Sequence, residues 1–391
     1  MATEWHVQAL AARQQQIADA FSAGQLEQSE QLARELIDAG YATLPVWRAL
    51  GLSLRQQGHI AQACEIQQRL VDTAPGNVDL RFDLAETLLL KGDYARGWQH
   101  YQYRYSLDHT RHMDRKVKAP LWKGQAMPGK TLLIHDEQGY GDTFQFIRLV
   151  ERARRQSQAR IVVQIRAEQA AFARRLPEID EVVLQGQLPP PFDAHCQMMS
   201  LPRALNLHLD ELPGALPYLQ ADPYRVERWR LRLQPLRRPW IALAWAGRPT
   251  HDNDRNRSMT LEQLSALAPV AAQGASLLSV QKGPAAAQAH SPLGGLRLEA
   301  LGDELSDFED TAAVLQLCDL LISVDSSPVH LAGALGRPVW VMLPLVPDWR
   351  WLMERDDTPW YPQMRLFRQT TRGQWSDVVE RVAKQLHVLV T

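Results

Sequence analysis

The chain has 391 residues, of which 45% are hydrophobic and 22% charged, so its length and composition predict two or three ordinary globular domains. A formal net charge of -1 excludes a general electrostatic attraction to nucleic acid. Cys64, Cys196 and Cys318 lie too far apart for a disulfide framework or a zinc site, and neither a secretion signal nor a membrane span is predicted, so we expect a cytoplasmic protein.

Glycines recur at a fixed spacing near the start of the chain. Gly24, Gly58 and Gly92 are 34 residues apart, a period that indicates stacked helix pairs, and we expect about three such pairs over residues 4–107. The middle unit resembles the tetratricopeptide repeat at Trp47, Leu50, Gly51, Leu54, Ile60, Ala63 and Pro75. Two uses stay open: a concave surface for a protein partner, or a brace for the rest of the chain.

After a linker at Lys118–Gly129, short apolar runs alternate with helical stretches such as Phe144–Arg155. This alternation predicts parallel sheets with helices on both faces. The predicted strands are Thr131–Ile134, Ile161–Ile165, Val182–Leu184, Phe192–Met199, Trp240–Trp245, Leu277–Val280, Leu320–Val324 and Val339–Met342. A proline-rich connection at residues 213–238 separates two such units, so we expect two Rossmann-like domains that face each other across a cleft.

The loop after the first predicted strand contains glycines and carboxylates. Gly139 and Gly141 allow a ligand to approach the backbone, and with Gln138 they form the candidate acceptor-side loop. Asp142 lies near a helix N-terminus, where its carboxylate is stabilised, and is the candidate general base, with Glu137 as second choice. This loop alone leaves open whether Asp142 is a base or only a helix cap. Its spacing does not fit the dinucleotide motif Gly-x-Gly-x-x-Gly.

Three further loops carry candidate binding residues for a nucleotide diphosphate. Basic and hydroxyl side chains suit phosphate oxygens, and the backbone N–H groups of the helix that starts near Ser327 form an anion site. The candidate donor-binding residues are Trp245, Gly247, Arg255, Arg257, Ser258, Gln281, Lys282, Asp325, Ser326, Ser327 and His330. No metal ligand is predicted, because the nearest match to Asp-x-Asp, Asp252-Asn253-Asp254, lies in a loop assigned to phosphates.

These motifs resemble those of a known superfamily. Residues 125–390 resemble the glycosyltransferase-B (GT-B) superfamily, close to the heptosyltransferase-like family 9 enzymes. The Gly141-Asp142 turn resembles that family's Gly-Asp turn, whose Asp is the proposed base, and Asp325–Ala332 resembles its donor-binding segment Asp-x-x-x-x-His-Leu-Ala. The succession of repeats and such a region also resembles bacterial tetratricopeptide glycosyltransferases, some of them implicated in flagellin modification. Trp245–Gly247, Gln281–Gly283 and Pro347–Trp351 are similar to that group.

The resemblance implies an all-α tetratricopeptide-repeat domain over residues 1–117, followed by a GT-B fold. Its two Rossmann-like domains would be an acceptor-side domain over residues 118–222 and a donor nucleotide-sugar domain over residues 223–391. It implies a metal-independent, inverting glycosyltransferase that uses a nucleotide sugar, needs no other cofactor, and acts on a protein acceptor such as flagellin held by the repeats. Two alternatives stay open: a transferase acting on lipopolysaccharide or another glycan, and a non-catalytic repeat scaffold with a degenerate nucleotide-binding domain.

Overall fold

The structure is a computed structural model and describes residues 2–251 and 253–390. The chain divides into two compact units. The first comprises the residues up to Lys116 together with Val346–Glu354, and the second comprises Val117–Leu345 and the residues from Arg355 onward. A short segment from late in the sequence therefore folds with the amino-terminal unit.

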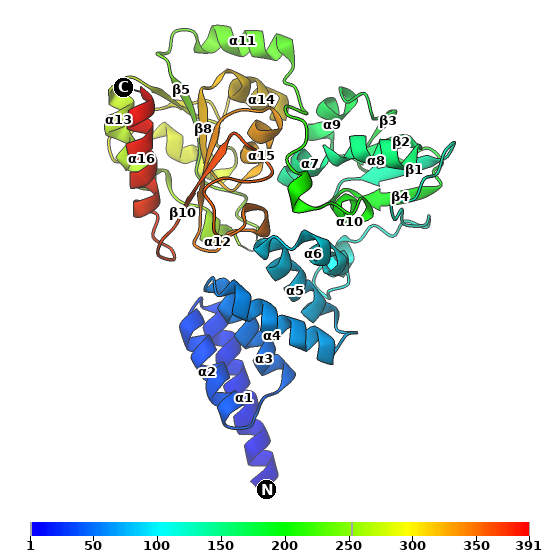
Figure 1. Ribbon diagram of the computed structural model, residues 1–391. Coiled ribbons are helices and arrows are strands. Elements are labelled where there is room, and N and C mark those ends of the chain that lie inside the picture. Colours follow the sequence, from blue (N-terminus) through cyan, green and yellow to red (C-terminus); the bar gives the residue numbers. More distant parts are fainter. Residues whose placement is uncertain (1, 252, 391) are drawn as a thin grey trace. The chain divides into compact units, whose positions relative to one another are not determined.

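The described part of the first unit is helical. Its helices are α1 (Ala2–Ser22), α2 (Leu26–Asp38), α3 (Leu44–Gln56), α4 (Ile60–Thr73), α5 (Val78–Lys91) and α6 (Tyr94–Tyr101), followed by the short 3-10 turns η1 (Gln102–Tyr105) and η2 (Arg111–Met113) (Figure 1). Gly24, Gly58 and Gly92 stand in the turns after α1, α3 and α5 with φ values of 77°, 89° and 90°, which glycine adopts without steric cost. The helical character of this region is confirmed, whereas the tetratricopeptide assignment stays a prediction.

The segment Val346–Glu354 packs against the last helix pair of this unit. It contains the 3-10 turn η7 (Trp349–Trp351), and the Trp349 ring lies with its centroid 5.2 Å from that of Trp98 and 6.0 Å from that of Tyr101. The turn at Gly58 lies against the same segment, because a Cβ atom there would contact Met353 and Val346. The sequence analysis grouped Pro347–Trp351 with the α/β region and did not expect this packing.

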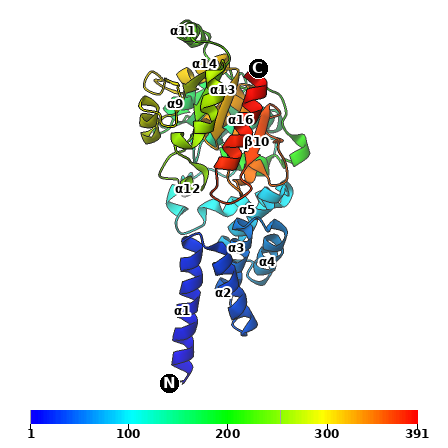
Figure 2. The same cartoon turned by 90° about the vertical axis from the view of Figure 1, so that its left-hand side faces the viewer.

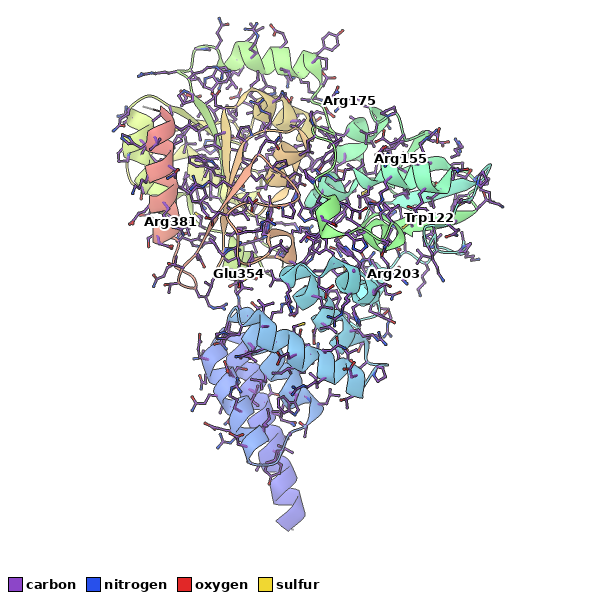
Figure 3. The ribbon with its side chains drawn as sticks, in the orientation of Figure 1. Trp122, Arg155, Arg175, Arg203, Glu354 and Arg381 are labelled. Carbon is purple, nitrogen blue, oxygen red and sulfur yellow. The ribbon has the colours of Figure 1, made fainter. Side chains whose placement is uncertain are left out.

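The first sheet of the second unit is parallel, with strand order β3-β2-β1-β4. Its strands are β1 (Thr131–His135), β2 (Arg160–Ile165), β3 (Glu181–Leu184) and β4 (Ala194–Gln197), with α7 (Tyr140–Phe146), α8 (Leu149–Ser157), α9 (Ala167–Arg174), η3 (Met198–Ser200), α10 (Leu201–Ala204) and η4 (Leu209–Glu211) between or after them. The buried Trp122 binds this sheet at β4, where its backbone N–H donates to the His195 carbonyl over 2.7 Å (Figure 3).

Two predictions for this half differ from the structure. The expected strand Phe192–Met199 is shorter, because Met198 already begins the 3-10 turn η3. The expected helix Phe144–Arg155 is split between α7 and α8 at Arg148, whose guanidinium turns inward to bind two backbone carbonyls. Local pattern alone did not reveal either interruption.

The second sheet is also parallel, with strand order β10-β9-β8-β5-β6-β7. Its elements are β5 (Trp240–Ala244), α12 (Asp254–Arg257), η5 (Leu261–Leu267), α13 (Ala268–Ala272), β6 (Ser276–Ser279), η6 (Pro284–His290), β7 (Glu299–Ala300), α14 (Phe308–Leu317), β8 (Leu320–Val324), α15 (Ser327–Ala334), β9 (Val339–Leu343), β10 (Met364–Arg368) and α16 (Ser376–Val390). Figures 1 and 2 show α13 and α16 on one face of the sheet and α14 and α15 on the other. The core on the α16 face joins Ile241, Ile322 and Val382.

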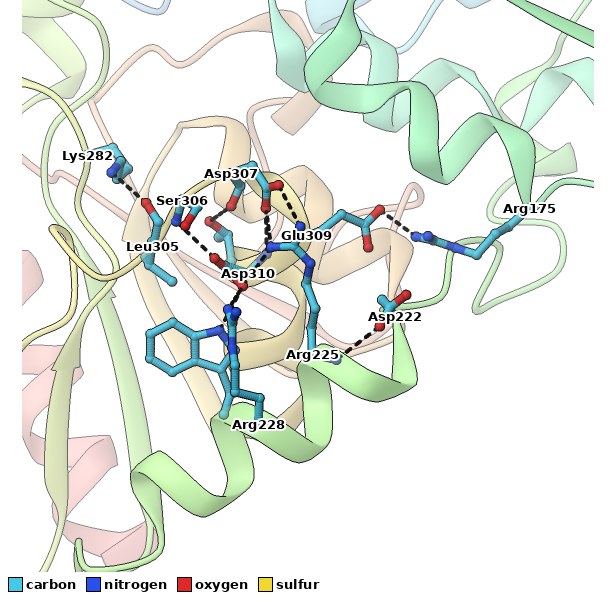
Figure 4. Close-up of polar contacts among 12 residues, drawn as sticks. Arg175, Asp222, Arg225, Arg228, Lys282, Leu305, Ser306, Asp307, Glu309 and Asp310 are labelled. Atoms are coloured by element: carbon cyan, nitrogen blue, oxygen red, sulfur yellow. Dashed lines mark hydrogen bonds and ion pairs between the residues drawn. The ribbon is translucent and has the colours of Figure 1, made fainter.

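The predicted connection at residues 213–238 contains a helix that the sequence analysis did not expect, α11 (Pro223–Leu233). Arginines of α11 bind acidic residues at the start of α14: Arg225 reaches Asp307 and Asp310, and Arg228 also pairs with Asp310 (Figure 4). The indole N–H of Trp229 donates to the same Asp310 carboxylate over 3.0 Å. The buried carboxylate of Asp310 therefore ties α11 to α14.

The strand order decides which loops meet. In a parallel sheet all carboxyl ends lie at one edge, and β8, β5 and β6 are neighbours, so the loops that follow these three strands emerge side by side. The α/β architecture with parallel sheets is confirmed. The proposed boundary between residues 222 and 223 stays a prediction, because both sheets belong to one compact unit.

Candidate functional site

The loops after β1 and β8 come together, although they belong to different sheets. Helix α7 contacts α15, and the closest approach is at Gly141. A Cβ atom at this position would lie 2.8 Å from Cδ2 of His330, closer than real Cβ atoms come to other atoms. The acceptor-side loop and the Asp325–His330 segment, both predicted from the sequence as site residues, therefore lie side by side.

The carboxylates of the first loop take different positions. Asp142 accepts a hydrogen bond from the backbone N–H of Gly139 over 2.7 Å, which closes the N-terminus of α7. Glu137 is buried and accepts from the backbone N–H of Met199 over 2.9 Å, at the start of η3. In this structure the Asp142 carboxylate thus caps the helix. Its role as a general base stays a prediction. Glu137 instead ties the loop to the chain after β4.

His330 lies in the first turns of α15 and is 5% exposed. Its Nδ1 atom is 3.1 Å from the hydroxyl of Tyr361, and its Nε2 atom is 3.9 Å from Oδ1 of Asp325. The imidazole therefore has a phenol on one side and a carboxylate on the other. This arrangement fixes the plane of the ring and directs Nε2 toward the loop that follows β8.

The serines of this loop form its turn. Ser326 precedes the first residue of α15 in an extended conformation, and its hydroxyl lies 3.1 Å from that of the buried Ser323. Ser327 is the first helical residue and is followed by Pro328, which suits a first helical turn. The backbone N–H groups in the first turn of a helix have no partner within the helix, so the start of this eight-residue helix is suited to bind an anion, which stays a prediction.

The loop after β5 is folded around Asp254. Its Oδ1 atom accepts from the Ser258 hydroxyl over 2.8 Å, and that hydroxyl accepts from the Gly247 backbone N–H over 2.9 Å. A Cβ atom at Gly247 would lie 2.6 Å from Nη2 of Arg257, so this glycine permits the close packing. Arg255 is exposed on the same short helix, α12. Asp252 lies outside the described residues.

Gln281 and Lys282 are engaged with the protein backbone. The Gln281 amide oxygen accepts from the N–H groups of Trp245 and Ala246, each over 2.9 Å, and its amide nitrogen donates to the Ala246 and Lys282 carbonyls. Lys282 Nζ donates to the carbonyls of Gly302 and Leu305, over 2.7 and 2.8 Å (Figure 4). In this structure Gln281 therefore shapes the loop after β5, and one of the three Lys282 protons is left for another acceptor.

Trp245 has its ring in the core of the second sheet. It is fully buried and packs with the cluster that includes Ile241 and Leu261. Only its backbone belongs to the loop at the sheet edge, where Gln281 holds it. A direct contact between a ligand and the indole ring is therefore disfavoured by its position.

The sequence analysis missed the residues that surround His330. Tyr361 is buried, and its ring fills the space above Gly333, where a Cβ atom would lie 2.5 Å from its Cδ1. The Arg148 guanidinium lies over the rings of Tyr361 and Tyr218, at 5.0 and 4.2 Å from their centroids. In the sequence, Gly333 one turn after His330 is compatible with a ring packed closely against this helix. The sequence does not indicate which ring this is.

A salt bridge also joins the part of the second unit that holds the first sheet to the part that holds the second sheet. Arg175, which follows α9, binds the buried carboxylate of Glu309 on α14 over 2.7 Å (Figures 3 and 4). Burial raises the pKa of Glu309, and Arg175 offsets only part of that effect. The Phe308 ring packs edge-on against Tyr140 and Phe144 of α7. The halves therefore meet through α7, α14 and α15.

Another pair that the sequence analysis did not single out lies at the base of the first loop. The stacked rings of His135 on β1 and His195 on β4 have their centroids 5.5 Å apart, with Nε2 of the former 3.2 Å from Nδ1 of the latter. Both side chains are buried, and His135 directly precedes the loop that carries Glu137 and Asp142.

Metal sites and membrane-spanning helices would indicate other kinds of function. Residues 2–251 and 253–390 contain no group of three or more His, Cys, Asp or Glu side chains arranged to hold a metal ion. Within the same residues, every helix is too short or too polar to pass through a lipid bilayer.

Part of this site matches the model of a known protein family. Residues 305–341, which include α14, β8, α15 and the Asp325–His330 segment, match the model of glycosyltransferase family 9 (heptosyltransferase). Protein FlbA from Caulobacter vibrioides is 26% identical over 347 residues, which cover 83% of this chain and 57% of FlbA, so the chain spans little more than half of that relative.

Among solved structures, the chain is similar to the ADP-heptose lps heptosyltransferase II of E. coli, with 16% identity, a TM-score of 0.48, and 66% of this chain and 98% of that chain covered. It is also similar to a family 9 glycosyl transferase from Veillonella parvula, with 12% identity, a TM-score of 0.48, and 68% and 100% covered. The family match agrees with the expected resemblance for residues 305–341, where the sequence motif and the geometry of α15 coincide.

Proposed function

We propose that the chain transfers a sugar from a nucleotide-sugar donor to a hydroxyl group of an acceptor. The reaction is metal-independent and inverts the anomeric centre. The donor lies on the second sheet, at the loops after β5, β6 and β8, and the acceptor approaches from the loop after β1. The acceptor is a protein, such as flagellin, presented by the helical unit, and the reaction takes place in the cytoplasm.

One observation carries this proposal: Gly141 lies against His330. This contact brings the loop with a candidate base next to the segment that matches the glycosyltransferase family model. A transferase needs both groups at one place, because the acceptor hydroxyl must lose a proton while the donor phosphate departs. If the two loops lay apart, neither could serve the other.

The roles of the residues follow from their chemistry. Asp142 accepts the proton of the attacking hydroxyl, and its position in the first turn of α7 favours the anionic form. The N–H groups at the start of α15, together with His330 and Lys282, stabilise the negative charge that develops on the departing phosphate. Arg255, Arg257 and Ser258 add donors from the neighbouring loop. Inversion follows when the hydroxyl attacks from the side opposite the leaving phosphate.

A second candidate differs in the acceptor. The family model that matches residues 305–341 is described as heptosyltransferase, which favours a heptose donor and a glycan acceptor such as lipopolysaccharide. In that case the helical unit only braces the α/β unit. The same purified protein separates the two candidates when it is offered nucleotide-activated heptoses and other sugars with either a flagellin or a glycan acceptor.

The sharpest test is the substitution Asp142→Asn. The amide oxygen of Asn still accepts from the Gly139 N–H, so the cap of α7 is retained while the base is lost. We expect transfer to fall about 100-fold to 10,000-fold, the usual contribution of a general base, with the donor dissociation constant almost unchanged. Transfer is measured with the labelled sugar nucleotide, and binding by calorimetry.

The matched control is Asp222→Asn, because Asp222 caps α11 by accepting from the Arg225 backbone N–H over 3.0 Å and lies outside the site. This variant should transfer sugar at the rate of the unmodified protein. Full transfer by the Asp142→Asn variant would remove Asp142 from the mechanism. If the unmodified protein neither binds, hydrolyses nor transfers any sugar nucleotide, the scaffold alternative replaces the proposed function.

A further inference from the structure

The surroundings of His330 contain a group with no place in the function proposed above. Tyr361 lies in the segment before β10, 31 residues from His330 in sequence, and its hydroxyl is 3.1 Å from His330 Nδ1. Both side chains are buried. A histidine with both nitrogens near polar partners is fixed in orientation, and its proton location depends on which partner donates and which accepts.

Tyr361 is held firmly by parts of both halves. Its ring occupies the space that Gly333 leaves open on α15. From the first half, Arg148 Nη1 donates to the carbonyl of Trp360 over 2.9 Å, and the Arg148 guanidinium covers the Tyr361 ring. The Trp360 ring packs edge-on against Phe146 of α7, with 5.5 Å between the centroids. The hydroxyl therefore has little freedom to leave Nδ1.

The chemistry of His330, Tyr361 and Asp325 limits which atom donates a hydrogen bond and which accepts one. A phenol hydroxyl donates a hydrogen bond, and a neutral imidazole accepts one at the nitrogen that carries no proton. The Asp325 carboxylate only accepts, and it lies 3.9 Å from Nε2. The Tyr361 hydroxyl also faces that of Tyr218, whose own proton goes to the Phe144 carbonyl, so Tyr361 has two acceptors within reach, Tyr218 and Nδ1. When Tyr361 donates to Nδ1, the His330 proton is on Nε2 and points toward Asp325.

We propose that Tyr361 is a positioning residue: its hydroxyl donates to Nδ1 of His330 and thereby keeps the His330 proton on Nε2, where it is presented to the phosphate of the bound donor. This inference rests on the proposed function for the role of His330 in donor binding. It assigns no new chemistry to Tyr361, which acts through the imidazole. It also explains why Arg148 leaves the helix path between α7 and α8, since that turn anchors the segment that carries Tyr361.

The test is the substitution Tyr361→Phe, which keeps the ring over Gly333 and beneath Arg148 and removes only the hydroxyl. In protein with 15N-labelled histidine, the His330 signals are assigned by their loss in a His330→Asn variant. We expect the unmodified protein to show the Nε2–H tautomer and the Tyr361→Phe variant a mixture of both tautomers. The kcat/KM for the donor should fall about tenfold, the size expected for one lost hydrogen bond.

Tyr140→Phe is the matched control. Tyr140 also lies beneath an arginine, with the Arg166 guanidinium 5.2 Å from its ring centroid, but its hydroxyl donates to Glu168 over 2.9 Å and not to His330. Its loss should leave the His330 signals unchanged. A double variant, His330→Asn with Tyr361→Phe, should transfer sugar no more slowly than His330→Asn alone, because Tyr361 acts only through His330.

The outcomes separate this inference from the proposed function. Unchanged His330 signals in the Tyr361→Phe variant overturn the inference, whatever the activity. The inference also fails if Tyr140→Phe changes these signals as much as Tyr361→Phe does. Altered signals with unchanged donor binding support the positioning role of Tyr361, and they count against the role of His330 in the proposed function.

Discussion

At the scale of single residues, Gly141 is the most constrained position of the site. Its Cα hydrogens face the imidazole of His330, and the site exists only because no side chain separates them. Many glycines are needed for a left-handed turn, but Gly141 does not have a positive φ and lies inside α7. Glycine is needed at this position to avoid a steric clash and not to permit an unusual backbone conformation.

The close contact at this glycine predicts the effect of Gly141→Ala. The added methyl would lie 2.8 Å from His330 Cδ2, and that ring cannot move easily because Tyr361 holds Nδ1. Either α7 or α15 must shift, at a cost of about 1–3 kcal/mol in the free energy of unfolding, the usual effect of overpacking. Urea unfolding measures this cost, and the donor dissociation constant should rise as well.

Gly76→Ala provides the comparison. Gly76 precedes α5, and a Cβ atom there would meet no atom within 4 Å. We expect its free energy of unfolding to change by less than about 0.5 kcal/mol, as for most surface substitutions. If Gly141→Ala were equally silent in stability and in donor binding, the contact between the two loops would not be part of the working protein.

At the scale of elements, the join between α11 and α14 depends on one carboxylate. Asp310 is fully buried at the start of α14. Burial alone raises its pKa, but the hydrogen bonds from the Ser306 N–H, the Trp229 indole and Arg225 outweigh this effect, so the pKa of Asp310 lies below its ordinary value of 3.8. The ionised form is therefore favoured by folding, and the join is an electrostatic one.

The sign of the pH dependence follows from this shift. An acid with a lowered pKa in the folded state stabilises the protein above its unfolded pKa, and the stabilisation is lost as pH falls through the folded value. Asp310→Asn should cost about 1–3 kcal/mol at neutral pH. Arg225 keeps its pair with Asp307 and the Arg228 side chain is 59% exposed, so the cost comes mainly from the charged hydrogen bonds of the buried Asp310 carboxylate. The difference between the variant and the unmodified protein should begin to shrink below about pH 4, and it should disappear only as pH falls through the lowered pKa of folded Asp310.

Asp357→Asn is the control for this prediction. Asp357 also pairs with an arginine, Arg355, but its side chain is 63% exposed, so its loss should cost less than about 1 kcal/mol. Unfolding by urea between pH 3 and pH 7 compares the two variants. A constant difference between Asp310→Asn and the unmodified protein at all pH values would contradict the electrostatic origin of the join.

The helices and strands also show most clearly which features could be predicted from the sequence. Strands made mostly of apolar residues, such as Leu320–Val324, were predicted with their observed bounds. β10 was missed because Arg365 and Arg368 interrupt its apolar run, and the two-residue β7 is too short to carry a pattern. The Asp325–His330 segment was found because its strand, turn and helix are consecutive. Tyr361 was not, because a contact over 31 residues leaves no local signal.

At the scale of the whole molecule, the segment Val346–Glu354 connects the two units through the chain itself. It leaves the second sheet after β9, folds with the helical unit, and returns to the residues that precede Tyr361. Its anchor is Trp349, which is 4% exposed among Tyr94, Trp98 and Tyr101, with the Arg350 guanidinium 4.2 Å from the Trp349 ring centroid. The helical unit therefore binds a segment of its own chain, whatever else it binds.

This connection predicts that Trp349→Ala uncouples the units. The loss of a buried tryptophan should lower the stability of the helical unit by about 3–5 kcal/mol. Because the segment is then no longer anchored, we expect calorimetry to show two separate unfolding transitions where the unmodified protein shows one. Trp47→Ala is the control, since Trp47 on α3 packs against buried side chains of the helical unit and has no contact with Trp349 among the described ring contacts. It should lower the helical transition and keep the coupling. If both variants behave alike, the helical unit does not brace the rest of the chain through Val346–Glu354, and acceptor binding remains its proposed role.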